Sequence, residues 1–292
     1  MIIVQLKGGL GNQMFQYATG LHLSVLRKTE LKLDTSFFNI PGNYTQRHYE
    51  LDVFGIKATL ATAEEITSFR STSSWRYARY LQRKFPYFFN KAYIAESGHA
   101  YHPLFVHYPK NTYLEGFWQS EKYFSSIAPA IRNTFSFKEP LNEANAALAE
   151  RIKTTASVSI HVRRGDYISN PIASGYHGIC EAPYYQNAIK YLQAKHSDIH
   201  VFIFSDDLEW VKQNLKFDLP AEYINHNTGS NSHIDMQLMS LCKHNVIANS
   251  SFSWWGAWLN TNPAKIVIAP ANWFTDKATD WSDVYAKSWI IQ

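Results

Sequence analysis

Two adjacent arginines at the end of a predicted strand are the residues of this chain whose chemistry is easiest to specify. Residues 157–161, which read SVSIH, alternate as a strand does, and Arg163 and Arg164 follow almost directly. In open α/β sheets, ligands bind outside the carboxyl ends of the strands. Because paired guanidinium groups bind phosphate oxygens and stay charged, this position predicts a site for a phosphate-bearing ligand such as a nucleotide.

The elements around these arginines predict a parallel sheet. Besides the strand at 157–161, the C-terminal half is expected to hold strands at 200–204, 223–224, 245–248 and 265–269, and helices at 182–196, 232–242 and 251–259. Such alternation indicates a parallel sheet with helices on both faces and right-handed crossovers.

The N-terminus predicts a second unit of the same kind. A strand over residues 1–6, a glycine-rich turn, a helix over 12–27 and a strand over 31–34 form a βαβ unit. The turn is similar to a dinucleotide-binding fingerprint, but Met14 stands where the third glycine or alanine belongs, and no P-loop lysine follows Gly11. The turn therefore predicts NAD binding only weakly.

Length and composition bound the class of protein. The 292 residues suit about two domains, and we expect an N-terminal domain over residues 1–150 and a C-terminal domain over 151–292. No window reaches the roughly 18 apolar residues of a membrane span. The first strand meets Lys7 too early for a signal peptide, so we expect a cytoplasmic protein. A net charge of +4 argues against nucleic acid as a partner.

Four separated segments carry a more specific pattern. They read GGLGNQMFQYA at 8–18, GFWQSEKYF at 116–124, HVRRGDY at 161–167 and NSSFSWWGAWL at 249–259. In this order they resemble glycosyltransferase family 11, the alpha-1,2-fucosyltransferases. The resemblance implies inverting transfer of L-fucose from GDP-beta-L-fucose to the 2-hydroxyl of a terminal beta-galactose in a glycan acceptor, as in surface polysaccharide or O-antigen synthesis.

The resemblance also implies the fold and the place of each substrate. We expect an α/β, GT-B-like architecture of two Rossmann-like domains with parallel sheets. The C-terminal domain would bind GDP-fucose, and the N-terminal domain would take most of the acceptor.

Metal and cofactor sites are not expected. Cys180 and Cys242 lack the spacing of metal ligands and predict buried, reduced thiols. No D-x-D triplet, which metal-dependent transferases commonly carry, occurs in the chain. The negative charge that develops on a departing diphosphate would then be neutralised by fixed cations such as Arg163 and Arg164.

Similarity to the related alpha-1,6- and protein O-fucosyltransferases implies roles for the HVRRGDY residues. Arg163 would contact the β-phosphate, and His161 would reach the ribose or the phosphate. Arg164 would partly brace the site, and Asp166 is included among the residues that bind the substrate. The alternative is that the arginines make ordinary salt bridges, for example with Asp166.

Asp235 is the predicted contact to the base. Guanine presents adjacent N1–H and N2–H donors, which one carboxylate can accept together, whereas adenine lacks that pair. The similar fucosyltransferases place an aspartate at this position before a serine-rich loop. Ser232 and Asp235 also fit a capping box, and both roles can hold together. Asp206 and Asp207 are expected to cap the helix that follows them.

The serine-rich loop opens a predicted helix. Ser250, Ser251, Phe252 and Ser253 follow a strand, so hydroxyl and backbone N–H groups there are candidates to bind the diphosphate. Serine is also a favourable N-cap, which is the alternative. The three tryptophans of the same helix are expected to pack against the sheet.

Asn12 joins Arg163 and His161 as an expected catalytic residue. It matches an asparagine that the protein O-fucosyltransferases place beside the donor phosphate and the acceptor hydroxyl. Those enzymes carry an arginine three residues earlier, where this chain has Gly9, so no cation is expected from this loop. Asn12 as a helix N-cap is the alternative. The general base stays open among four candidates: Glu115, Glu121, His161 and Asp166.

Residues 69–91 form the most basic and aromatic stretch of the chain. Arg76, Arg79 and Arg83 fall on one face of a predicted helix, which could rest on anionic lipid headgroups. Such contact would suit a lipid-linked acceptor and a peripheral position on the inner face of the cytoplasmic membrane. The alternative is a solvated helix face over an aromatic core.

Other functions also remain open. One is a fucosyltransferase of other linkage or a transferase for a related GDP-sugar. Another, from a different class, is a scaffold that binds a GDP-sugar without turnover. Slow hydrolysis of GDP-fucose would favour an enzyme, and tight GDP binding with no turnover would favour the scaffold.

Overall fold

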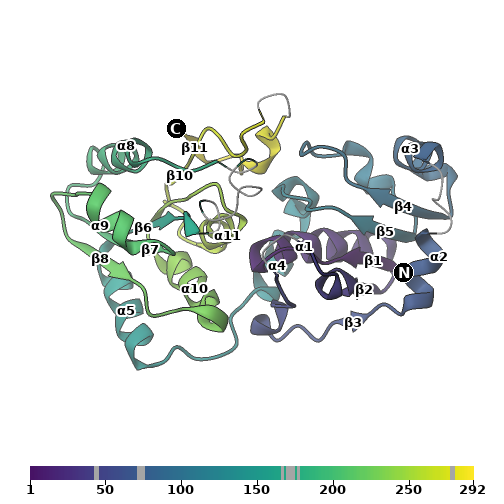
Figure 1. Cartoon of the computed structure of the whole chain (residues 1–292), viewed down its shortest axis with the longest axis horizontal. Helices are drawn as coiled ribbons and strands as arrows, with labels where there is room; N and C mark the ends of the chain where they lie inside the picture. The colour runs from purple at the N-terminus through teal and green to yellow at the C-terminus, as the bar shows by residue number, and fades with distance from the viewer. Residues whose placement is uncertain (43–45, 71–75, 166–167, 169–174, 176–177, 277–279) are drawn as a thin grey trace. The chain divides into compact units, whose positions relative to one another are not determined.

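The computed structural model describes the chain except residues 43–45, 71–75, 166–167, 169–174, 176–177 and 277–279. It forms two compact units. Unit 1 comprises Met1–Lys138 and Thr279–Val284, and unit 2 comprises Glu139–Ala278 and Tyr285–Gln292. In Figure 1 unit 1 runs mainly from purple to blue, and unit 2 from teal to yellow.

Unit 1 is built on a five-stranded parallel sheet in the order β3-β2-β1-β5-β4. Its strands are β1 (Ile2–Gln5), β2 (Leu31–Asp34), β3 (Thr59–Leu60), β4 (Lys91–Ala95) and β5 (Asn111–Glu115). Its α-helices are α1 (Leu10–Arg27), α2 (Ala63–Arg70), α3 (Arg76–Lys84) and α4 (Ala128–Thr134).

Unit 2 is built on a six-stranded parallel sheet in the order β11-β10-β9-β6-β7-β8. Its strands are β6 (Ala156–Val162), β7 (Ile199–Ser205), β8 (Ala221–Ile224), β9 (His244–Val246), β10 (Val267–Ala269) and β11 (Ile290–Ile291). Its α-helices are α5 (Glu143–Thr154), α8 (Ala182–Gln193), α9 (Leu208–Asn214), α10 (His233–Leu241) and α11 (Ser251–Leu259). The predicted pair of parallel α/β domains is thus confirmed.

The elements predicted from the sequence are present, with shifted ends. The predicted strand over 31–34 is β2 and the predicted helix over 251–259 is α11, whereas the strand expected at 265–269 begins only at Val267. Strands β3, β4, β5 and β11 were not predicted from the sequence. These strands have at most five residues each, and pairing with neighbouring strands defines them better than any local pattern.

The central strand β6 shows why this sequence folds as a parallel strand. Six of its seven residues are buried, because neighbouring strands and both faces of the sheet cover it. Its two serines, Ser157 and Ser159, are buried but hydrogen-bonded: they accept from Lys243 N–H at 3.0 Å and from Asn245 Nδ2 at 2.7 Å. The polar positions therefore join β6 to the segment containing β9.

Each sheet contains one point where the strand order reverses. In unit 1 the chain builds β1, β2 and β3 in one direction and places β5 and β4 on the other side of β1. In unit 2 it builds β6, β7 and β8 and then places β9 on the other side of β6. Such a reversal opens a crevice at the carboxyl ends of the two diverging strands, where ligands bind in open α/β sheets.

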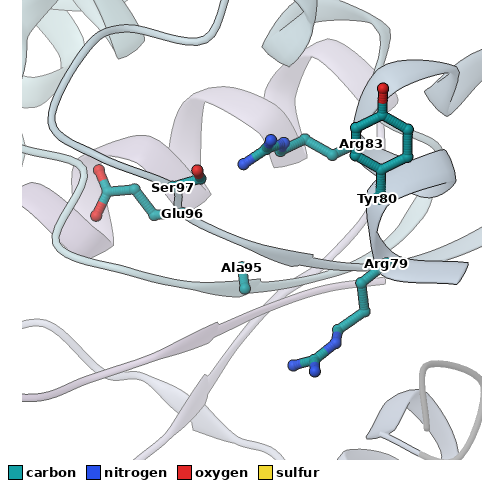
Figure 2. A pocket seen from close by; sticks show the side chains of 6 residues that line it. All are labelled: Arg79, Tyr80, Arg83, Ala95, Glu96 and Ser97. Carbon is teal, nitrogen blue, oxygen red and sulfur yellow. The ribbon is translucent and has the colours of Figure 1, made fainter. Parts of the chain in front are cut away.

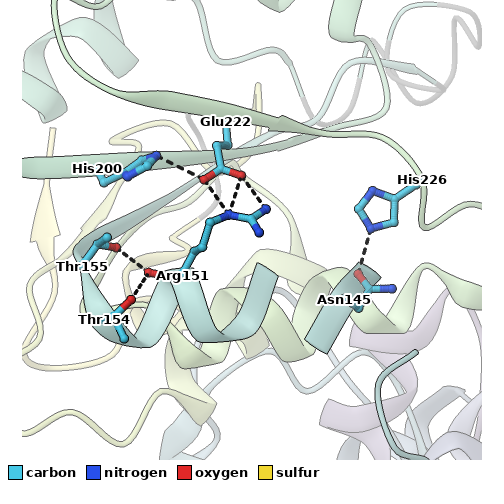
Figure 3. A network of polar contacts seen from close by, with 7 residues as sticks. All are labelled: Asn145, Arg151, Thr154, Thr155, His200, Glu222 and His226. Atoms are coloured by element: carbon cyan, nitrogen blue, oxygen red, sulfur yellow. Dashed lines mark hydrogen bonds and ion pairs between the residues drawn. The ribbon is translucent and has the colours of Figure 1, made fainter. Parts of the chain in front are cut away.

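Helix α5 belongs to unit 2. Figure 3 shows Arg151 of α5 paired with Glu222 of β8 at 2.9 Å, and the same carboxylate 3.4 Å from His200 of β7. Asn145 at the other end of α5 lies 2.9 Å from the ring nitrogen Nε2 of His226. The units accordingly divide before α5, whereas the predicted boundary at residue 150 passes through this helix.

The cores confirm two predictions about apolar residues. Trp254, Trp255 and Trp258 of α11 are buried, as their expected packing requires. Cys180 and Cys242 are buried free thiols. Among the described residues, no helix is both long and apolar enough to cross a bilayer.

Candidate functional site

The carboxyl edge of the unit 2 sheet brings together three of the predicted site segments. β6 pairs with β7 through Val162 and Ser205 and with β9 through Ile160 and Val246. The residues that follow these strands therefore emerge side by side on one edge. Arg163 and Ser250 come from the two strands that flank the reversal of strand order.

Asp206 holds the arginine pair in place. Its carboxylate is 2.9 Å from Nη1 of Arg163 and accepts the backbone N–H of Arg164 at 2.8 Å. A side chain on Gly165 would also collide with this carboxylate, since an added Cβ would lie 2.9 Å from Oδ2. The sequence predicted Asp206 as a cap of the following helix, but its carboxylate binds the arginine pair instead. Asp207 provides the cap by accepting the N–H of Trp210 at 3.1 Å.

The guanidinium of Arg164 is engaged inside unit 2. It lies 3.9 Å above the ring of Trp210, and its Nε is 3.4 Å from Asp207. Only 12% of the side chain is exposed. A cation over an indole face with a carboxylate beside it is stabilised in one orientation. This geometry fits the bracing role expected for Arg164 better than direct contact with a substrate.

His161 is buried at the end of β6. Burial, together with the nearby charge of Arg163, lowers the pKa of its imidazole to about 4, although Asp206 acts in the opposite direction. Its Nδ1 has no hydrogen-bond partner among the described residues, and its ring lies 5.7 Å from that of Phe252. A neutral imidazole with an unused nitrogen can bind a ligand, but a pKa this low makes it a poor general base.

The start of α11 separates the serines by role. Ser250 is the N-cap and accepts the N–H of Phe252 at 3.3 Å, so the capping alternative is confirmed. Ser251 and Phe252 are partly exposed in the first turn. Ser253 is completely buried, and its hydroxyl donates to the carbonyls of Ala248 and Ser250. The Ser253 hydroxyl therefore points into the protein, and the expected ligand contact of Ser253 stays a prediction.

Asp235 lies in the first turn of α10, at the same edge of the sheet. The Ser232 half of the predicted capping box is not formed, since the Ser232 side chain makes no cap hydrogen bond. Asp235 instead accepts Nδ2 of Asn227 at 2.7 Å, and Asn227 exchanges hydrogen bonds with Asn145 of α5 at 2.9 and 3.0 Å. Burial raises the pKa of the Asp235 carboxyl to about 7.

The carboxyl edge of unit 1 joins the two N-terminal family segments. Asn12 is the third residue of α1, and its Oδ1 accepts Nε2 of Gln119 at 2.7 Å. Gly9 is the N-cap of α1, so the alternative of Asn12 as N-cap was wrong. Gly8 has a φ of +77°, and an added Cβ there would lie 2.5 Å from Nδ2 of Asn12. The glycine therefore lets the amide lie against the loop.

The turn after β5 is fixed by polar contacts. Gln16 of α1 donates to the carbonyl of Gly116 at 3.1 Å. The carboxylate of Glu96, directly after β4, accepts the N–H groups of Phe117 at 2.6 Å and Trp118 at 2.9 Å. Trp118 has a φ of +56°, a conformation uncommon for a bulky residue that such contacts can hold in place. Burial raises the pKa of Glu96 to about 7.

A cation does reach the glycine loop, from elsewhere in the chain. The guanidinium carbon of Arg47 is 3.9 Å from where a Cβ on Gly9 would lie. Nearby, Glu50 accepts the N–H of Leu10, and burial raises the pKa of its carboxyl despite the opposing charges of His48 and Arg47. Neither Arg47 nor Glu50 belongs to a recognisable motif, so neither residue could be predicted from the sequence.

Comparison with known proteins decides the family. The profile of glycosyl transferase family 11 matches residues 1–292. The chain belongs to this family.

Two relatives in Escherichia coli match nearly end to end. An alpha-1,2-colitosyltransferase is 36% identical over 298 residues, covering 99% of this chain and 98% of the relative. The O-antigen biosynthesis glycosyltransferase WbnK is 36% identical over 308 residues, covering 98% of each. A solved structure of POFUT1 in complex with GDP matches with a TM-score of 0.51 at 13% identity, over 92% of this chain and 97% of that one. The predicted GT-B-like fold is confirmed.

The family 11 segments thus lie in two places: 8–18 and 116–124 meet in unit 1, and 161–167 and 249–259 meet in unit 2. Asp166 lies outside the described residues, and its binding role stays a prediction. Of the other base candidates, Glu115 accepts the hydroxyl of Tyr93 and Glu121 lies near Arg132. Within the described ranges, no three His, Cys, Asp or Glu side chains form a group that could hold a metal ion.

Proposed function

We propose that this family 11 glycosyltransferase transfers L-fucose from GDP-beta-L-fucose to the 2-hydroxyl of a terminal beta-galactose, with inversion and without a metal ion. The observation that carries the proposal is Arg163, held by Asp206 at the point where strand order reverses in unit 2. The resemblance of the four segments to alpha-1,2-fucosyltransferases supports the sugar and the linkage.

The chemical demand is the negative charge that grows on the β-phosphate as GDP leaves. A cation already fixed in position stabilises that charge without having to reorganise. Arg163 meets this requirement because the Asp206 carboxylate orients its guanidinium before any substrate binds. Ser251 and Phe252 would add backbone N–H groups from the first turn of α11.

Asp235 supports guanine as the base. One of its oxygens accepts the amide of Asn227, and its second oxygen has no hydrogen-bond partner among the described residues. A carboxylate held in this way can accept N1–H and N2–H of guanine. We propose that the Asn145–Asn227 pair positions this carboxylate.

The amides of unit 1 support binding of a neutral glycan. Asn12 and Gln119 supply donors and acceptors at the reversal point of the first sheet, and sugar hydroxyls require both. We propose that Asn12 lies beside the attacking 2-hydroxyl. The O-antigen name of the relative WbnK supports a polysaccharide acceptor.

A second candidate donor is GDP-colitose. The relative named an alpha-1,2-colitosyltransferase favours it, and colitose is L-fucose without its 3-hydroxyl. This alternative keeps the linkage and the nucleotide and changes only the sugar.

A single set of reactions tests these proposals. The protein is incubated with GDP-fucose or GDP-colitose and with lactose or N-acetyllactosamine, in excess EDTA. The linkage and the anomeric configuration of the product are determined by NMR. We expect α-fucose on O2 of galactose. Faster transfer from GDP-colitose would show that GDP-colitose, and not GDP-fucose, is the preferred donor. A requirement for manganese would contradict the proposal that Arg163 neutralises the charge on the departing GDP without a metal ion. Fucose on a GlcNAc oxygen would contradict the linkage, and tight GDP binding without turnover would indicate a scaffold.

A further inference from the structure

A pocket of about 310 Å³ lies in unit 1 between α3 and the end of β4. Figure 2 shows the side chains that line it: Arg79, Tyr80 and Arg83 from α3, and Ala95, Glu96 and Ser97 from the end of β4 and the residues after it. Because Arg79 and Arg83 are four residues apart on one helix, both line the same cavity. Figure 2 shows their guanidinium groups directed to different parts of it, with Ala95 between them.

The charge of these two arginines is not balanced within the described part of the chain. Neither Arg79 nor Arg83 has a hydrogen bond or an ion pair with a described residue, and the charge of Arg83 contributes to lowering the pKa of His102. The carboxylate of Glu96 also lines the pocket, but its two oxygens accept backbone N–H groups of the turn after β5. Two guanidinium groups in one pocket favour an oxyanion.

The surface near this pocket carries unusually exposed aromatic side chains. Tyr77 is 61% exposed, and Tyr87 and Phe88, in a 3-10 turn that directly follows α3, are 60% and 76% exposed. The rings of Tyr87 and Phe88 lie 4.6 Å apart. Residues 76–91 contain five Lys or Arg residues and no Asp or Glu. Exposed aromatic rings among basic side chains are typical of segments that lie in a bilayer interface.

We propose that residues 76–91 dock on an anionic phospholipid bilayer and that Arg79 and Arg83 bind lipid phosphate groups at the α3–β4 pocket. Tyr87 and Phe88 enter the headgroup region, while the guanidinium groups bind phosphate oxygens through paired hydrogen bonds. This replaces the flat helix face expected from the sequence with a specific headgroup site. The proposal goes beyond the transfer reaction and needs no donor or acceptor.

The test is co-sedimentation of the whole protein with vesicles of phosphatidylcholine alone or mixed with phosphatidylglycerol. We expect binding to the mixed vesicles only, weakening as salt rises. The double variant Arg79→Ala/Arg83→Ala should bind about thirtyfold more weakly, since each basic residue near the surface contributes about fivefold. Arg79→Lys/Arg83→Lys keeps the charge but loses the paired geometry, so it should restore only part of the binding.

Lys212→Gln/Lys216→Gln is the matched control, because it removes two exposed lysines from unit 2. This control should bind the mixed vesicles like the unaltered protein. An equal loss of vesicle binding in the control would overturn the proposed phosphate site, because it would show that only non-specific charge attraction holds the protein on the vesicles. Phe88→Ser, a milder change at an exposed position, should also weaken binding if the rings enter the bilayer.

Two further outcomes would overturn the proposal. If inorganic phosphate in solution occupied the arginine pocket and vesicles did not bind, the site would serve a soluble anion. If sedimentation velocity showed self-association that Phe88→Ser abolished, the aromatic face would bind a second copy of the chain. Melting curves of each variant must match the unaltered protein. Failure of fucose transfer would leave the vesicle result unaffected.

Discussion

The carboxyl edges of the two sheets follow the same plan and carry different chemistry. In both, two family segments meet where the strand order reverses. The edge of unit 2 holds the charged groups Arg163 and Asp206, whereas the edge of unit 1 is joined by the amides of Asn12 and Gln119. In the proposed function, one architecture would thus serve two kinds of recognition, and the residues after the strands would decide which.

This difference predicts that substitutions at the two edges lower turnover by different amounts. Hydrogen bonds between charged groups are roughly twice as strong as neutral ones, and a cation aimed at growing charge acts mainly in the transition state. A neutral amide pair contributes only about 0.5–1.5 kcal/mol. Substitutions in unit 2 should therefore affect turnover more than those in unit 1.

The largest effect is expected at Arg163. Arg163→Ala should lower turnover by roughly a hundredfold or more, because the charge on the departing GDP would lose its fixed cation. Arg163→Lys should not restore it, since an ammonium lacks the paired geometry. Steady-state rates with GDP-fucose and lactose measure both.

Arg151→Ala is the control for this prediction. Arg151 is an exposed arginine of the same unit, and it pairs with Glu222. The substitution Arg151→Ala should therefore leave turnover unchanged. Near-native turnover in Arg163→Ala, with an unchanged melting temperature, would remove Arg163 from the mechanism.

An intermediate effect is expected at Asp235. Asp235→Asn should weaken GDP binding by about tenfold and reduce the preference for GDP over inosine diphosphate, which lacks the N2 amine. Calorimetric titration with both nucleotides measures this. Unchanged affinity in a folded variant would exclude Asp235 from base recognition.

The pH dependence of GDP binding gives a separate test of Asp235. Burial raises its pKa to about 7, so the carboxyl gains its charge as the pH rises through neutrality. The guanine N–H donors favour the charged form, so GDP affinity should increase from about pH 6 to about pH 8. In Asp235→Asn, the part of this rise in GDP affinity that comes from deprotonation of Asp235 should be absent. An identical pH profile in the variant would contradict the assignment.

The smallest effect is expected from the amide pair of unit 1. Gln119→Ala should lower kcat/KM only about two- to tenfold, because it frees the Asn12 side chain without removing it. In an Asn12→Ala background the same change should cost almost nothing, which a double-mutant cycle measures. Gln46→Ala, an exposed glutamine of unit 1 bonded to the carbonyl of Phe38, is the control. Additive losses would show that Gln119 does not act through Asn12.

Sequence patterns predicted the elements that organise both edges. The alternation of strands and helices was enough to predict β6, β7 and β9, and therefore that Arg163 and the Ser250 loop would emerge on one edge. A strand-to-helix transition does not show which serine hydroxyl turns inward. The hydroxyl of Ser253 does so because it donates to the carbonyls of Ala248 and Ser250.

Other parts of the site depend on contacts between distant segments. Arg47 reaches Gly9 and Glu96 holds the turn at Trp118, yet neither Arg47 nor Glu96 is near its partner in the sequence. The raised pKa of Glu96 comes from burial, which a sequence does not show for a single glutamate. The pairing of Asn227 with Asn145 likewise requires knowing that α5 packs within unit 2.

The return of Thr279–Val284 to unit 1 limits how this enzyme can be recombined with its relatives. Asp283 in that segment accepts the backbone N–H of Tyr101 at 2.7 Å and pairs with Lys122. A chimera joined once, at Lys138, would replace the carboxylate on which both groups depend with that of another parent. Donor and acceptor preferences would therefore be exchanged cleanly only when this short C-terminal segment is grafted together with residues 1–138.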